Sequence, residues 1–478
     1  MKIQPWIRAL VKILAVGLGA VLLLFVALMV GFDLRIELAG NGFRPIVSFG
    51  DTEEHYEILE LNRSQHYSRL LPAGSSSSID SDTAAPPEKN FSRQYWTDFR
   101  GPNRDGHYDQ VPLLKSWPGP GLEPLWIQPI GGGYASFVVA ENRAFTIEQR
   151  REQEVVVAYD VVTGRELWTH AWEAYFNETL GGPGPRATPT WHDGRLYALG
   201  ATGHFWCLDA TTGEVLWHRD ILKDSGADNL PWAMSASPLI VDDLVIMQPG
   251  GSDGWSVAAY HRLTGEIIWH TLDDVQGYTS PMLMTLDGME QVVTVTAERA
   301  LGLHIDDGTL LWEYPWVTPT VPSMTQPILY EENHIFLSSG YGHGAAGIKI
   351  NSFNGEFRVE TVWSSNRMKN KFSSSVLHDG YIYGFDEAIL ACIEAATGNL
   401  QWKGGRYGYG QLLLAGDHLI VLTERGELVL VEARPDKHQE VSGFSALEGK
   451  TWNVPALAEG RLLVRNAREM AAFDLNVR

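Results

Sequence analysis

Aromatic and basic side chains recur at one position of a repeated segment in this 478-residue chain. The position lies two residues before the Ser-Pro or Thr-Pro step that opens a short strand, as at Thr188-Pro189 and Ser280-Pro281. Its eight copies are Tyr134, Arg186, Ser235, Tyr278, Met324, Phe372, Tyr409 and Trp452, with Lys369, Lys371 and Arg406 close by. Ring faces beside cations suit a planar anionic ligand, a sugar or an extended peptide.

These residues give two hypotheses. In the first, a ligand-binding mouth is formed by Tyr134, Arg186, Tyr278, Lys371, Phe372, Arg406, Tyr409 and Trp452. In the second, the rings only pack between neighbouring repeats. The glycine-rich segments 131–133 and 404–406 would let backbone approach a ligand closely.

Catalytic and metal-binding patterns are missing from the sequence, so we predict no catalytic residue and no metal site. It contains no Gly-x-Ser-x-Gly elbow, His-Glu-x-x-His helix, Cys-x-x-Cys pair or phosphate-binding loop. Gly342-His343-Gly344 and Asp306-Asp307-Gly308 are interpreted as turns, because a calcium loop needs more oxygen ligands at fixed spacing. Cys207 and Cys392 occupy equivalent places in two distant repeats, which predicts buried thiols and no disulfide.

The charge balance excludes one class of partner. Acidic residues outnumber basic ones 58 to 37, giving a net charge of −21. Nucleic-acid binding requires a basic surface, so we exclude it as the main function. The excess acidic residues are expected on the solvated surface.

The repeat itself supplies the framework that must position the mouth. Segments such as AYDVVTGRELW (158–168) and CLDATTGEVLW (207–217) read as strand, glycine turn and strand ending in Trp. The repeat tryptophans are Trp126, Trp168, Trp217, Trp269, Trp312, Trp363 and Trp402, with a weaker copy ending at Trp452. The turn glycines are Gly164, Gly213, Gly265, Gly308 and Gly398. We expect each indole to pack between blades, next to a glycine that makes the tight turn.

Spacings of 39 to 52 residues with about four short strands each are typical of propeller blades. Two-residue turns make the strands antiparallel, which disfavours a parallel solenoid. Residues 454–475 supply three strands, and residues 123–129 the missing fourth. The sequence therefore predicts an all-β, eight-bladed β-propeller of four-stranded antiparallel blades over 94–478, closed by the N-terminal strand and monomeric.

The N-terminal region predicts a membrane anchor. Residues 13–32 form an uncharged apolar run of twenty residues, long enough to span a bilayer. Basic residues in 1–12 place that end in the cytoplasm and the propeller outside it. A cleaved signal peptide is the alternative, but the run is long and lacks an A-x-A site. We expect a hairpin around Asn41-Gly42 within 33–72 and a disordered linker over 73–93, with no helix beyond the anchor.

The A-x-D-x-x-T-G-x-x-x-W repeat resembles the pyrroloquinoline-quinone (PQQ)-like propeller family. This family includes quinoprotein alcohol dehydrogenases and the BamB-like subunit of the outer-membrane barrel-assembly machinery. The stretch Trp96–Gly106 (WTDFRGPNRDG) is similar to the opening motif of many bacterial PQQ-like proteins. The resemblance covers residues 94–478 and is specific for fold, whereas one fold hosts many activities.

The resemblance implies three functional alternatives. A binding or assembly scaffold of the bacterial envelope, with protein partners or a small ligand, is the leading hypothesis. A PQQ-dependent dehydrogenase would hold quinone and Ca²⁺ on the axis under two adjacent cysteines, a pair this sequence lacks, so neither cofactor is predicted. A carbohydrate-binding envelope module is the third. The BamB-like subunit is a lipoprotein of the outer membrane, whereas no cysteine follows the apolar run here, which predicts an inner-membrane anchor.

Overall fold

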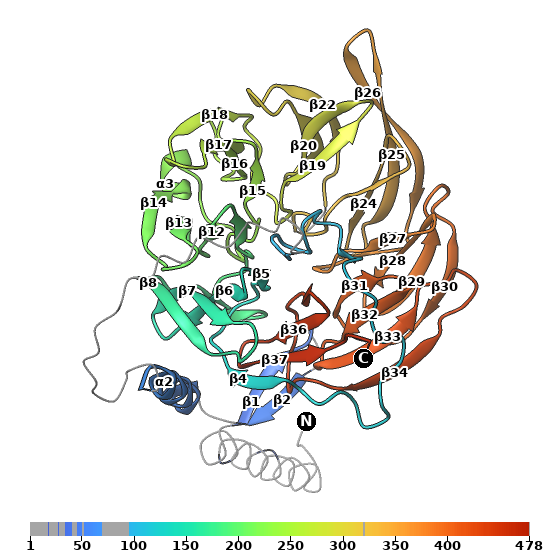
Figure 1. Ribbon diagram of the computed structural model, residues 1–478. Helices are drawn as coiled ribbons and strands as arrows, with labels where there is room; N and C mark the ends of the chain where they lie inside the picture. The colour runs from blue at the N-terminus through green and yellow to red at the C-terminus, as the bar shows by residue number, and fades with distance from the viewer. Residues whose placement is uncertain are drawn as a thin grey trace, which may run out of the picture.

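The computed structural model describes residues 34–40, 45–49, 52–68, 95–318 and 321–477, together with Leu18 and Ala27. Within these residues the chain forms eight antiparallel blades around one central axis (Figure 1). The first strands of neighbouring blades contact one another and so surround the axis. The prediction of an eight-bladed propeller with four-stranded blades is confirmed.

Blades one to four run outward from the axis in chain order. Blade one is β5 (Val138–Ala140), β6 (Arg143–Arg150), β7 (Gln153–Asp160) and β8 (Glu166–Glu173). Blade two is β11 (Thr190–His192), β12 (Arg195–Leu199), β13 (His204–Asp209) and β14 (Val215–Asp220). Blade three is β15 (Leu239–Val241), β16 (Leu244–Met247), β17 (Val257–His261) and β18 (Ile267–Thr271). Blade four is β19 (Met282–Leu286), β20 (Met289–Val295), β21 (Arg299–Leu303) and β22 (Leu310–Pro315).

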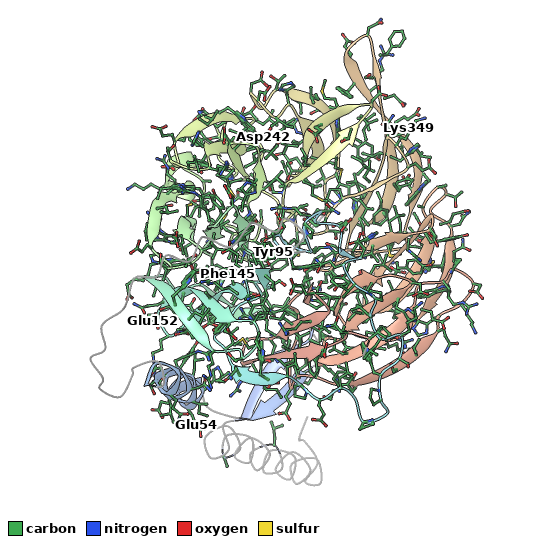
Figure 2. All side chains as sticks on the ribbon, viewed as in Figure 1. Glu54, Tyr95, Phe145, Glu152, Asp242 and Lys349 are labelled. Atoms are coloured by element: carbon green, nitrogen blue, oxygen red, sulfur yellow. The ribbon has the colours of Figure 1, made fainter. Side chains whose placement is uncertain are left out.

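The next three blades follow the same order. Blade five is β23 (Ile328–Tyr330), β24 (His334–Ser339), β25 (Gly344–Phe353) and β26 (Glu356–Ser365), whose long outer hairpin, bearing Lys349, projects from the disc (Figure 2). Blade six is β27 (Val376–His378), β28 (Tyr381–Asp386), β29 (Ile389–Glu394) and β30 (Leu400–Gly404). Blade seven is β31 (Gln411–Ala415), β32 (His418–Leu422), β33 (Glu427–Glu432) and β34 (Glu440–Ser445), with β3 (His107–Tyr108) parallel to β31. Connecting loops carry β9 (Asn177–Glu178), β10 (Gly182–Pro183) and α3 (Ile221–Ser225).

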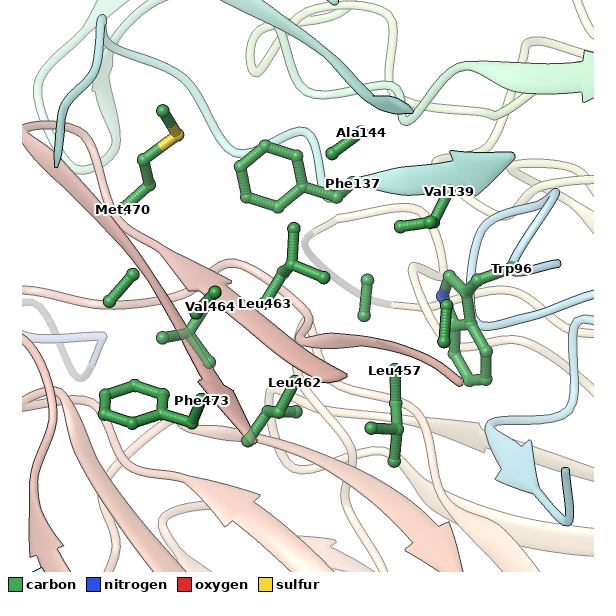
Figure 3. Packing of buried hydrophobic residues seen from close by; sticks show 14 of the residues in the cluster. Trp96, Phe137, Val139, Ala144, Leu457, Leu462, Leu463, Val464, Met470 and Phe473 are labelled. Atoms are coloured by element: carbon green, nitrogen blue, oxygen red, sulfur yellow. The ribbon is translucent and has the colours of Figure 1, made fainter. Parts of the chain in front are cut away.

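Blade eight closes the ring with strands from both ends of the propeller. It consists of β35 (Ala456–Ala458), β36 (Arg461–Arg465), β37 (Glu469–Asp474) and β4 (Trp126–Pro129). β4 pairs antiparallel with β37, with Trp126 opposite Ala472, and the Leu125 amide donates to the Ala472 carbonyl at 2.7 Å. Figure 3 shows the apolar core beside this seam, where Phe137 of blade one faces Leu463 and Met470 of blade eight. The predicted closure is confirmed.

Six of the seven repeat tryptophans join their blade to the next, whereas the Trp312 indole donates to Gln291 of its own blade. The indole of Trp217 donates to the Arg262 carbonyl of the following blade at 2.9 Å, and five other repeat tryptophans make the same bond. A Cβ added to the next blade's turn glycine would approach the indole to between 2.4 and 2.8 Å, as at Gly398 against Trp363. These glycines also have φ near +70°, so both the turn and the contact require glycine.

The repeat tryptophans lie opposite small residues of the third strand. Cys207 faces Trp217 and Cys392 faces Trp402, on blades two and six. Both cysteines are buried thiols outside any disulfide, as predicted. In blade seven, Gly443 occupies the position that holds the repeat tryptophan in other blades, and it faces Val429. Interpreting Trp452 as the eighth repeat tryptophan is therefore wrong: it lies after β34, in the loop that leads into blade eight.

Two N-terminal elements lie against the propeller. β1 (Leu34–Leu38) and β2 (Pro45–Phe49) pair as the expected hairpin. The helix α2 (Thr52–Ser68) contradicts the expectation that no helix follows the anchor. Its inward face is short: among the side chains that the structure describes in this helix, the buried ones are Tyr56, Leu59 and Arg63, so its sequence lacks a sustained apolar stripe.

Two predicted N-terminal segments fall largely or wholly outside the described residues. The predicted span 13–32 lies outside the described residues except for Leu18 and Ala27, and the linker 73–93 lies wholly outside them. Among the described residues, the structure contains no helix with the length and apolar character needed to cross a membrane.

Candidate functional site

A belt of hydrogen bonds around the axis fixes the geometry of the channel mouth. Each bond joins the residues just before the first strand of one blade to the equivalent residues of a neighbouring blade. Examples are the Ser237 amide to the Ser280 hydroxyl at 2.8 Å and the Ser280 amide to Gln326 Oε1 at 2.8 Å. Gln411 and Asn453 extend the belt through blades seven and eight. Every predicted mouth position lies one or two residues before a belt residue, so the positions are equivalent in space.

The structure brings seven of the eight aligned positions into one cavity of about 150 Å³. They are Tyr134, Arg186, Ser235, Tyr278, Met324, Phe372 and Trp452. Tyr409, the eighth, packs against Phe372 with ring centroids 5.6 Å apart. Other blades add Trp232 and Tyr341, whose rings lie 6.1 Å apart. Together, Tyr134, Trp232, Tyr278, Tyr341, Phe372, Tyr409 and Trp452 form an aromatic collar around the mouth.

Arg186 is the cation of one side of the collar. Its guanidinium lies over the Tyr134 ring at 5.4 Å and pairs with Glu178 at 3.4 Å. Burial lowers the pKa of Arg186 and raises the pKa of Tyr134 above its ordinary range, with smaller opposing contributions from their charged neighbours. Tyr134 therefore remains a neutral phenol, and Arg186 with its partner Glu178 gives this side of the collar an ion pair.

Lys371 and Glu424 form a second polar pair on the opposite side. Lys371 lies over the rings of Tyr341 and Tyr409 at 4.4 and 4.9 Å, and burial lowers its pKa. Glu424 accepts a hydrogen bond from the Trp452 indole at 3.1 Å. The two groups offer one donor and one acceptor beside ring faces, which suits a peptide backbone.

Two basic residues predicted near the mouth lie elsewhere. Arg406 is exposed and does not line the cavity, so its predicted place in the mouth is wrong. The glycine turn at Gly405 has φ +70°, and sequence spacing alone did not fix the direction of the following side chain. Lys369 pairs with the buried Asp386 at 2.7 Å.

The opposite end of the channel is closed by the axial segment, Trp96–Gly106. Arg104 donates to the Pro281 carbonyl at 2.8 Å and bonds the Ser237 and Pro238 carbonyls of blade three. Arg100 bonds the Ser375 carbonyl at 2.8 Å and the Leu412 carbonyl at 3.4 Å, in blades six and seven. Both guanidiniums are buried, and Phe99 of the same segment lines the cavity.

The cavity residues do not fit PQQ with Ca²⁺. Among the described residues, no group of three or more His, Cys, Asp or Glu side chains is placed to hold a metal. The axial segment fills the channel at the end opposite the mouth. Cys207 and Cys392 lie opposite the tryptophans of blades two and six, away from each other. Burial also raises the pKa of Cys207 to about 11 and of Cys392 to about 12, which keeps both protonated.

Sequence reasoning missed several cavity residues. Trp232, Tyr341, Glu178 and Glu424 come from loops of differing length, so no single alignment position marks them. A weak signal existed in Trp232, which is outside the repeat series.

A closed ring of tryptophan-and-glycine blades with an aromatic mouth defines a PQQ-like β-propeller. Residues 151–404 match the family described as outer membrane protein assembly factor BamB, and the chain belongs to this family. A curated relative, outer membrane protein assembly factor BamB of Shewanella oneidensis, is 22% identical over 327 residues, covering 66% of this chain and 80% of the relative.

Solved structures share the fold. BamB from Moraxella catarrhalis superposes with a TM-score of 0.53 at 15% identity, covering 74% of this chain and 99% of that one. Quinohemoprotein alcohol dehydrogenase from Comamonas testosteroni superposes with a TM-score of 0.58 at 14% identity, covering 80% and 81%. Because proteins named as an assembly factor and as an alcohol dehydrogenase share this architecture, the fold alone does not assign the activity.

Proposed function

We propose that the protein is an envelope assembly scaffold that binds a segment of a partner protein at the aromatic collar. The observation that carries this proposal is the aromatic collar, six of whose seven rings line one cavity, with a donor and an acceptor, Lys371 and Glu424, beside it. Aromatic anchors around a concave site are typical of protein-binding hot spots. The family match supports an assembly role.

The uncharged run 13–32 supports anchoring in the inner membrane, with the N-terminus in the cytoplasm and the propeller in the periplasm. A tether leaves the rigid disc free to meet partners at the membrane. We propose this location although the relatives are named for the outer membrane. Protease protection of epitope tags before and after the run would test it.

Site-specific photo-crosslinking of the full chain in its own host tests partner binding. A photoreactive phenylalanine at Tyr278, inside the collar, should capture a discrete protein partner. The same group at Phe353, which is 63% exposed on the tip of β25–β26, is the matched control and should not capture it. No adduct from position 278, or equal adducts from both positions, would overturn the proposal.

The enzyme and carbohydrate hypotheses are tested beside it. Addition of PQQ and Ca²⁺ with an alcohol or sugar and a redox dye should give no dye reduction above a heat-denatured control, because the cavity lacks a fitting ligand set. A glycan adduct at Tyr278 in place of a protein would favour the carbohydrate-binding alternative.

A further inference from the structure

Ala39 and Gly40, the two residues that follow β1 and that we call the hairpin tip, lie in the mouth of the propeller, a contact that the repeat does not account for. Ala39 and Gly40 are buried there. The Gly40 amide donates to Glu424 Oε1 at 2.6 Å, and the Gly40 carbonyl accepts from Lys371 Nζ. The rim pair therefore binds both polar groups of one residue's backbone.

The same contact selects glycine for a steric reason. A Cβ at position 40 would lie 2.5 Å from Tyr409 Cδ2 and 2.8 Å from Phe372 Cζ. Two collar rings thus close on the α-carbon from the side, and Tyr409 is met at Cδ2 and Cγ, close to its own backbone, where it cannot easily move away. Any side chain larger than hydrogen would have to displace them.

Beside this glycine subsite the cavity extends into an apolar pocket. Its lining includes Tyr134, Tyr278, Trp232 and Met324. Among the described hairpin residues, Glu37 also reaches the rim, where it pairs with Lys450 at 3.8 Å. The space suits an apolar side chain next to the bound glycine.

We propose that the collar is a receptor for a glycine-containing peptide turn with an adjacent apolar side chain, and that the hairpin tip occupies it in cis until a partner's segment replaces it. This inference rests on the proposed protein-binding function and names its ligand. Since the hairpin is covalently attached, its effective concentration is high. A partner peptide must therefore compete, and removal of the tip should increase the apparent affinity by the reciprocal of the fraction of molecules whose collar is free.

The probe is a labelled synthetic peptide of residues 34–49 (LRIELAGNGFRPIVSF), titrated into the purified full chain. Gly40→Leu in the protein should eject its own tip and bind the peptide at least about tenfold more tightly than the wild type. Gly119→Leu is the matched control, because its Cβ would meet nothing within 4 Å. It should bind like the wild type.

Two further variants define the site. A peptide carrying Leu at position 40 should bind the Gly40→Leu protein at least about tenfold more weakly than the native peptide. Adding Glu424→Gln and Lys371→Met to the Gly40→Leu protein should abolish binding. Equal affinity of the two peptides, or no gain in the Gly40→Leu protein, would overturn the inference.

Hydrogen exchange keeps the inference falsifiable if Gly40→Leu folds poorly. In the wild type the Gly40 amide should be protected, and excess native peptide should accelerate its exchange whereas the Leu peptide should not. Fast exchange without peptide would contradict cis occupancy. If hydrogen exchange and peptide affinity fail these tests while the photoreactive residue at position 278 still captures a protein, the inference is wrong but the proposed function stands. If the peptide binds as expected but no protein is captured, the proposed function is wrong.

Discussion

Replacement of Arg104 by methionine gives the sharpest test of how the axial segment holds the ring. The side chain is 3% exposed and bonds Asp98 Oδ1 at 3.1 Å, the Thr190 hydroxyl at 3.2 Å and three carbonyls of blades three and four. Methionine fills similar volume but donates nothing. The loss leaves a carboxylate and several carbonyls without their donor inside the disc.

The expected magnitude follows from this geometry. Breaking a buried ion pair by removing one partner costs about 3–5 kcal/mol. Because much of that cost is the remaining charge, adding Asp98→Asn should recover at least about 1 kcal/mol. Arg165→Met, the same substitution at an exposed turn position, is the control and should change stability by less than about 0.5 kcal/mol.

The assay is urea unfolding of the full chain, followed by tryptophan fluorescence and circular dichroism. The free energy of unfolding of Arg104→Met should fall by the stated amount, with partial recovery in the double variant. A loss no larger than that of Arg165→Met would refute the argument that the axial segment holds the blades together.

Three further predictions use the same assay. Gly398→Ala should destabilise the protein by at least about 1 kcal/mol more than Gly380→Ala. Both glycines have positive φ, but an added Cβ meets an indole only at Gly398, 2.4 Å from Trp363 Cε3. Equal losses of stability in the two variants would contradict the packing argument. Burial raises the pKa of Glu154 from 4.5 to about 7. The free energy of unfolding is therefore highest below pH 4.5 and falls by about 3 kcal/mol as the pH rises through 7, because the folded protein holds this proton more tightly than the unfolded chain. Glu154→Gln should flatten this dependence, and a pH profile unchanged by the substitution would refute the prediction. Arg63→Met should lower the free energy of unfolding by about 2 kcal/mol and make α2 sensitive to protease. The reason is that Arg63 of α2 pairs with the buried Glu166 at 3.1 Å and donates to the Pro129 carbonyl at 2.6 Å. An unchanged digestion pattern would contradict the claim that Arg63 holds α2 against the propeller.

The blades and their closure could be predicted because their determinants are local. A turn glycine and a tryptophan at fixed spacing specify one strand pair, and repetition specifies the rest. The mouth positions were found for the same reason, since Thr188 and Ser280 mark where each first strand meets the hydrogen-bonded belt.

What sequence reasoning missed depends on contacts between distant segments. Helix α2 is held largely by Arg63 and two apolar residues, so it has no periodic signal. Gly40 and Glu424 are 384 residues apart and have no shared motif. Trp452 shows the opposite failure, because a tryptophan at about the right interval was assigned to the repeat while its indole bonds Glu424 at the mouth.

The most direct test of the central claim is photo-crosslinking from Tyr278 in living cells, compared between the wild type and Gly40→Leu. If the collar binds a partner and the hairpin tip competes for the same place, position 278 captures one protein, with more adduct in Gly40→Leu. An adduct that is absent from both, or that disappears when the tip is displaced, would contradict the account.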